Sequence, residues 1–169
     1  MIRECKEYLI LKLKEAGIKS QVYTSMKKLE KSNESHIGAV LFEGDSFARS
    51  GSKTIYVDQG GVKQKRVKIF DRQISFVVVI GEYEESKCEV IFEKFITLLD
   101  RGIVIDGNFT PIEVEDADWV DENDSILKAK IAVQVKITFK GGLYKDSALG
   151  SIKEIEQSLE TKEDDNVNE

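Results

Sequence analysis

The stretch IAVQVKITF, residues 131–139, decides the fold that the sequence predicts. Its apolar positions are Ile131, Val133, Val135, Ile137 and Phe139. They alternate with alanine and polar residues, and successive side chains of a β-strand point to opposite faces of its sheet. We therefore predict a strand with one face in the core and the other face in water.

A second segment with strand character, residues 62–83, follows KTIYV at 53–57 and the turn sequence DQGG at 58–61. The two glycines can adopt the positive φ of a tight turn, so the pattern predicts a long β-hairpin. Near its end, the run 76–80 is apolar on both faces, which is typical of the middle of a sheet. The start of the same arm is polar and basic, and we expect that tip to project beyond the globule.

Two segments have the spacing of amphipathic helices. In the first, residues 2–16, the apolar positions are Ile2, Cys5, Leu9, Leu13 and Ala16, and Gly17 follows. The second begins at an S-x-x-E capping box, residues 86–89, and extends to about Leu99. Strands are expected at 18–24, 36–42, 103–105 and 112–114, with a loop at GDSFARSGSK, residues 44–53.

This order of elements predicts an α+β fold: a mostly antiparallel sheet covered on one side by two helices, with a projecting β-hairpin. Residues 1–145 are expected to form one domain. Residues 146–169 are expected to form a short helix and a polar, disordered tail.

Composition excludes several classes of protein. The 169 residues are 41% hydrophobic and 33% charged, which suits a globular chain with a core. The net charge of −6 argues against broad nucleic-acid binding, and no specific nucleic-acid binding is expected, although the charge leaves room for a local basic patch. No run approaches the ~20 apolar residues of a membrane span, and the first residues do not resemble a signal peptide. Cys5 and Cys88 lie on apolar helix faces and are expected to be buried thiols of a reducing compartment, the cytoplasm.

The usual parts of an enzyme are missing from the sequence. His36 is the single histidine, and a lone histidine in a polar loop is usually solvated. No phosphate-binding loop or dinucleotide fingerprint occurs. We expect no catalytic residues, no cofactor and no metal. A glycosidase that uses two carboxylates of the run 113–124 is the enzymatic alternative, although nothing suggests the raised pKa that a general acid needs.

Two segments of opposite charge stand out. The basic residues around the hairpin are Lys53, Lys63, Lys65, Arg66, Lys68 and Arg72. The acidic run EVEDADWVDEND, residues 113–124, contains the candidate interface residues Glu115, Asp116, Asp118, Trp119, Asp121 and Glu122. The run lacks the glycine and the ligand spacing of a calcium loop. Each segment is either a solvated surface or a protein interface, and unlike surfaces on one subunit favour head-to-tail assembly.

With these features the chain resembles the tail terminator, or tail completion, family of tailed phages and phage-tail-like bacteriocins. The resemblance extends from about Met1 to Lys145. It rests on the helix leading into IKSQVYTS, the hairpin around VDQGGVKQKRVKIF, the helix SKCEVIFEKFITLL and the strand KIAVQVKITFKGG. No catalytic motif defines that family.

The resemblance implies a structural protein of virion assembly. Its subunits would form a homo-oligomeric ring, commonly a hexamer, that caps the tail tube and stops its growth. The implied partners are the chain itself, the tail tube protein and a sheath or neck protein, as in a contractile tail or a tailocin. Assembly would take place in the host bacterial cytoplasm, and the protein would stay in the finished particle. Another component of the head-tail connector or neck, or a monomeric protein-binding module, remains the alternative.

Overall fold

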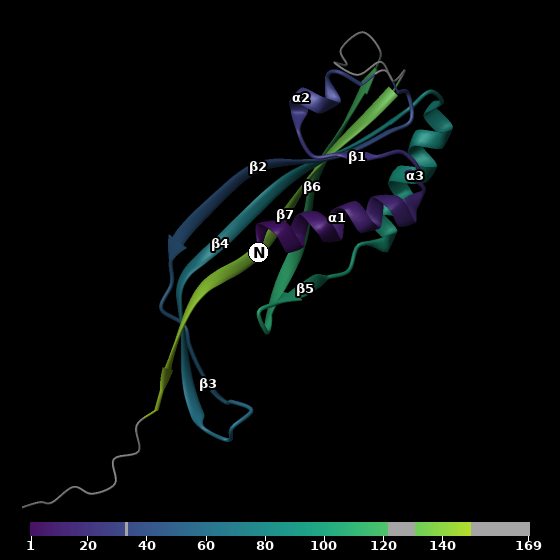
Figure 1. The fold of residues 1–169 in the computed structure, drawn as a ribbon. Coiled ribbons are helices and arrows are strands. Elements are labelled where there is room, and N and C mark those ends of the chain that lie inside the picture. The colour runs from purple at the N-terminus through teal and green to yellow at the C-terminus, as the bar shows by residue number, and fades with distance from the viewer. Residues whose placement is uncertain (33, 122–130, 150–169) are drawn as a thin grey trace, which may run out of the picture.

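A computed structural model describes residues 1–32, 34–121 and 131–149 of the chain (Figure 1). Its helices are α1 (Ile2–Ala16), α2 (Met26–Leu29) and α3 (Glu85–Leu98). Its strands are β1 (Val22–Tyr23), β2 (Ile37–Arg49), β3 (Lys53–Val57), β4 (Lys63–Glu82), β5 (Gly102–Ile105), β6 (Asn108–Asp121) and β7 (Ile131–Ala148).

Strands β4 and β7 are the spine of the sheet. They pair antiparallel from Gln64 opposite Ala148 to Glu82 opposite Ile131, almost the full length of the molecule (Figure 1). The strand order is β1-β2-β4-β7-β6-β5. β3 pairs with β4 beyond the end of β2, on the same side of β4.

The main core lies between one face of this sheet and the helices α1 and α3. Phe76 of β4 and Phe139 of β7 are fully buried there, with ring centroids 6.0 Å apart and planes at 90°. Leu9 and Leu13 of α1 and Phe95 of α3 are buried in the same cluster. These are the apolar positions that the helical and alternating patterns predict.

The predicted sheet architecture is wrong. Strands take up 54% and helices 24% of the described residues, in a curled, mixed half-barrel. The sheet is mixed because β1 runs parallel to β2. The helices do not share one side, because Leu29 of α2 packs on the opposite face of the sheet, against Ala39, Leu41 and Val79.

Bulges account for the curl. The pairing register shifts between Phe42 and Gly44, between Lys68 and Phe70, and between Val114 and Ala117. An extra residue in one strand bends that strand and increases its local twist. These long strands therefore form a curled sheet and not a flat antiparallel layer.

Two predicted loops are strands, and one predicted cap is absent. β2 continues to Arg49 through the segment expected as a loop, and β6 continues to Asp121 through the acidic run. Both segments carry polar side chains, but their backbones pair with β4 and β7 respectively. α3 begins at Glu85 after the N-cap residue Glu84, without the expected capping box.

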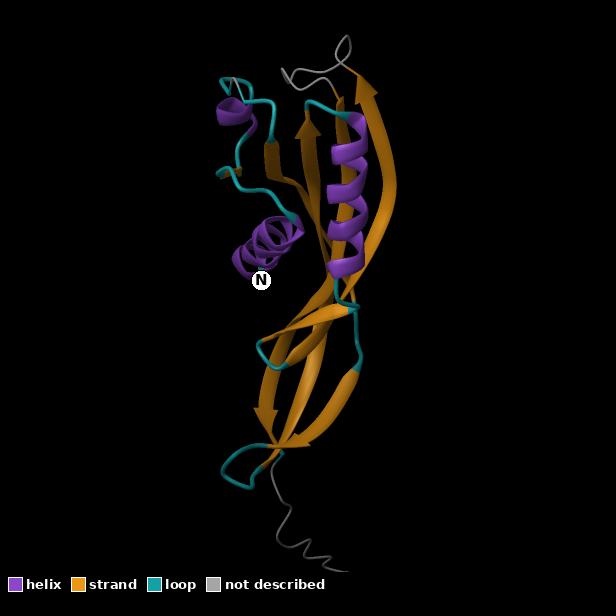
Figure 2. Ribbon diagram, turned by 90° about the vertical axis from the view of Figure 1, so that its right-hand side faces the viewer, coloured by secondary structure: helices purple, strands orange, loops and turns teal. Residues whose placement is uncertain are grey.

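The predicted hairpin is present in β3 and β4. Gly61 adopts a φ of 78°, in the left-handed region that glycine tolerates. The backbone N–H groups of Gly60 and Val62 donate to Asp58 Oδ1 at 2.9 Å. A hydrogen bond from Gln64, with those two, lowers the pKa of Asp58. Figure 2 shows this end of the sheet extending well past the helices.

β7 continues past the expected domain end at residue 145, to Ala148, where it still pairs with β4. Of the segment 146–169, expected to form a helix and a tail, residues 150–169 lie outside the described residues.

Replacing Phe76 by alanine (Phe76→Ala) should lower the free energy of unfolding by about 3–5 kcal/mol, because it opens a cavity beside Phe139. The matched control is Phe47→Ala, since Phe47 is an exposed phenylalanine of the same sheet and should cost about 1 kcal/mol or less. Urea unfolding of both variants measures the difference. Equal losses would contradict this assignment of the core.

Candidate functional site

The hairpin presents one face that is both basic and apolar. Cross-strand pairing sets Ile55 opposite Lys65, Val57 opposite Lys63, and Lys53 opposite Val67, so these side chains share a face. We name Lys53, Ile55, Val57, Lys63 and Lys65 the lysine strip. Ile55 is 63% exposed and Val57 59% exposed. Within the described part of the chain, none of the three lysines forms an ion pair.

The other face of the hairpin is closed by its own contacts. Arg66 donates from Nε and Nη2 to the two oxygens of Asp146, both at 2.7 Å, and from Nη1 to Asn108 Oδ1 at 3.2 Å. Its guanidinium lies 5.0 Å from the ring centroid of Tyr56 and 5.7 Å from that of Tyr144. The hydrogen bond from Arg66 is the main reason that the pKa of Asp146 is lowered.

An open cavity of about 710 Å³ adjoins this second face. Its wall includes Tyr56, Arg66 and Tyr144, and also Phe109 from the start of β6. Because Arg66 is already held by Asp146, the cavity does not present an unpaired cation from that residue.

Arg72 and Lys68 are also paired inside the chain. Arg72 donates to both oxygens of Asp45, at 3.0 Å from Nε and 2.6 Å from Nη2, and the two side chains are only 17% and 18% exposed. Lys68 forms an ion pair with Asp71. Of the six predicted basic interface residues, the structure therefore leaves Lys53, Lys63 and Lys65 with free ammonium groups among the described residues.

In the acidic run, too, some side chains have partners inside the chain and others have none among the described residues. Thr138 Oγ1 donates to Glu115 at 2.6 Å, and Lys136 lies 3.4 Å from the same carboxylate. The hydrogen bond from Thr138, supported by Lys136, lowers the pKa of Glu115. Asp116 and Asp118 are exposed and line a hollow beside Glu115, with no ion pair to any described residue.

Trp119 points away from those carboxylates. It pairs with Val133, whose side chain is in the main core, whereas Asp118 pairs with exposed Gln134. The indole packs edge-on against Phe92 of α3, with centroids 5.6 Å apart, and remains 44% exposed. The acidic run therefore has an aromatic face and a carboxylate face. Asp121 ends β6, and Glu122 lies outside the described residues.

His36 is not the solvated side chain that the sequence suggested. Its Nδ1 contacts the buried Glu82 carboxylate, and its Nε2 accepts a hydrogen bond of 3.0 Å from the Lys19 backbone N–H. An accepting Nε2 places the proton of the neutral ring on Nδ1, which then donates to Glu82. This histidine thus ties the segment before β1 to the end of β4.

Cys5 and Cys88 are fully buried, as predicted. Burial raises the pKa of Cys5 to about 12 and that of Cys88 to about 11, so both remain thiols at neutral pH. Across the described residues, no group of histidine, cysteine and carboxylate side chains converges to hold a metal ion. None of the helices described has the length and apolar character needed to cross a membrane.

A comparison with solved structures agrees with this architecture. No protein-family profile and no curated protein matches the chain. Among solved structures, the chain is similar to the sheath/tube terminator, in its extended state, of PVC, an extracellular contractile injection system. The TM-score is 0.57 at 9% sequence identity, over 97% of this chain and 65% of that chain. The predicted resemblance to tail terminators is confirmed in the fold, which is as far as such a low identity extends.

The sequence predicted the two charged segments but not which of their side chains are paired inside the chain. The signal was present in the alternation of KTIYV and KQKR, which separates Lys63 and Lys65 from Arg66 on a strand. The partners Asp45 and Asp146 were not predictable, because they lie 27 and 80 residues from the arginines they bind.

Two cations of β4, one paired inside the chain and one not paired with any described residue, should differ in how much their removal costs. Arg72→Met should lower the free energy of unfolding by about 2 kcal/mol, because it leaves the mostly buried Asp45 carboxylate without its partner. Lys65→Met should change it by no more than about 0.5 kcal/mol. Denaturant unfolding measures both variants, and a loss at Lys65 as large as at Arg72 would contradict the assignment of Lys65 as free.

Proposed function

We propose that this chain is a structural subunit that forms a ring on the end of a phage or phage-tail-like tube, stops its growth and joins it to a sheath or neck protein. The observation that carries the proposal is the fold shared with a sheath/tube terminator over 97% of the chain. The subunit would be assembled in the bacterial cytoplasm and would remain in the particle.

The lysine strip suits contact with the tube. It lies on the hairpin, which extends past the helices, so it can reach a neighbouring ring without a change in the core (Figure 2). Its lysines attract carboxylates, and Ile55 and Val57 provide apolar area to bury. We assign the strip to the rim of the tube protein, and the chemistry expected of that rim is acidic with an apolar centre.

The two ends of the subunit differ, which explains how growth would stop. The hairpin end consists of strands, whereas the opposite end carries α2 and the start of α3 (Figures 1 and 2). A polymer continues only while each added ring presents the surface that the next ring binds. A ring that docks through its hairpins would expose helices and not a new tube rim.

Reversing two charges of the strip tests this assignment. A chain with Lys63→Glu and Lys65→Glu should fold normally and fail to cap, since two attractions become repulsions. Electron microscopy of particles complemented with this variant should show tubes of variable, excess length, as in particles that lack the chain. The matched control, Lys14→Glu with Lys94→Glu, reverses two exposed helical lysines and should restore uniform length.

Tubes of normal length in particles without the chain would contradict the terminating role. Uniform tubes with the Lys63, Lys65 variant would instead remove the lysine strip from the contact and leave the role itself intact.

A further inference from the structure

A small basic surface lies at the first edge of the sheet. α2 follows β1, the outermost strand on that side, and is anchored by the buried Leu29. Its other residues, Met26, Lys27 and Lys28, are exposed. Neither lysine forms an ion pair with any other described residue. We name Met26, Lys27 and Lys28 the α2 edge.

A surface of opposite charge lies at the other side of the sheet. From Ile112 to Asp121, β6 pairs only with β7, so its second edge carries no strand within the described residues. Asp116 and Asp118 are exposed on one face of β6 and form no ion pair with any other described residue. Trp119 is 44% exposed on the opposite face of the same strand. We name Asp116, Asp118 and Trp119 the β6 edge.

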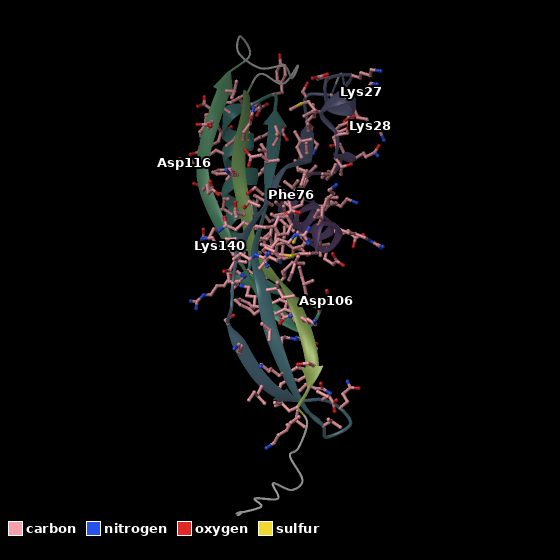
Figure 3. All side chains as sticks on the ribbon, turned by 90° about the vertical axis from the view of Figure 1, so that its left-hand side faces the viewer. Lys27, Lys28, Phe76, Asp106, Asp116 and Lys140 are labelled. Carbon is pink, nitrogen blue, oxygen red and sulfur yellow. The ribbon has the colours of Figure 1, made fainter. Side chains whose placement is uncertain are left out.

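The two edges are on opposite sides of one subunit and at a similar level along it. The strand order separates them by β2, β4 and β7. Figure 3 shows Asp116 on one side of the molecule and Lys27 and Lys28 on the other, all in the half that lies away from the hairpin. A translation across the sheet, with little movement along its long axis, therefore brings the α2 edge of one copy to the β6 edge of the next.

We infer that the α2 edge of one copy docks on the β6 edge of a second copy, head to tail, and that this is the lateral contact of the ring. The inference rests on the proposed function and goes beyond it by assigning the surfaces between subunits. Neither charged group has an ion-pair partner among the described residues, so docking supplies partners of opposite charge. Each edge also carries one half-exposed apolar side chain, Met26 or Trp119, which adds apolar area to the contact; Trp119 does so from the face of β6 opposite the two carboxylates.

The α2 edge and the β6 edge lie at a similar height along the long axis of the subunit. This is why a contact between them is favoured over one between the hairpin and the acidic run. A heterologous contact closes into a ring when the copies are related by rotation alone, and it grows into a helix when each copy is also displaced along the axis. The hairpin lies at the far end of the subunit from Asp116 (Figure 3). Joining those two surfaces would displace each copy along the long axis and would produce a helix.

Charge reversal tests the inference. One variant carries Lys27→Glu and Lys28→Glu, and a second carries Asp116→Lys and Asp118→Lys. Each places like charges across the contact and should weaken self-association by at least about tenfold. An equimolar mixture should assemble again, because each edge then finds an opposite edge on the other variant. Size-exclusion chromatography with light scattering, at low salt, measures all three samples.

The Lys14→Glu, Lys94→Glu chain is the control and should assemble as the original does; circular dichroism and thermal unfolding verify that every variant folds. The inference is overturned by an original chain that stays monomeric at micromolar concentration, by either variant assembling normally, or by a mixture that does not recover. This test distinguishes the lateral contact from the tube contact, because the chain with Lys63→Glu and Lys65→Glu should keep the ring and lose only the control of tube length.

Discussion

The antiparallel pairing of β4 with β7 is the constraint on which the rest of the structure depends. It continues from the buried rings of Phe76 and Phe139 to the hairpin end, where Arg66 on β4 binds Asp146 on β7. The described helices cover only the part nearer Phe76, so core packing stabilises that part and backbone pairing with ion pairs must stabilise the other. One pair of strands thus provides both the hydrophobic core and the arm that projects from it.

The register of that pairing also sorts the charges. Because strand residues alternate between faces, Arg66 turns toward Asp146 while its neighbour Lys65 turns away, although the two are adjacent in the sequence. By the same alternation Glu115 accepts a hydrogen bond from Thr138, whereas Asp118 forms no ion pair with any described residue. A basic segment and an acidic segment are thereby each reduced to a few groups available to a partner, and these groups lie on defined faces.

Sequence reasoning was reliable where burial and local geometry agree. The alternation of residues 131–139 and the helical spacing of residues 2–16 follow from burial on one side, and the hairpin turn follows from Gly61. It was wrong for the ends of β2 and β6, because exposed edge strands carry the polar residues that are typical of loops. The curl, the parallel β1 and the packing of Leu29 on the second face depend on contacts between distant segments, which local patterns do not encode.

The weakness of a single exposed ion pair explains why capping of a tube would depend on ring formation. An exposed ion pair contributes roughly 0–1 kcal/mol, so the three lysines of one strip would bind a tube rim only weakly. Several strips held in one ring act together, since the first contact raises the effective concentration of the others, and avidity can exceed a single affinity by about 10²–10⁴. β4 pairs with β3 in the hairpin and with β7, which also carries β6, so the sheet fixes each strip relative to the β6 edge. Lateral closure through that edge would therefore point all strips along one axis, and a lone subunit would leave the tube before it could stop its growth.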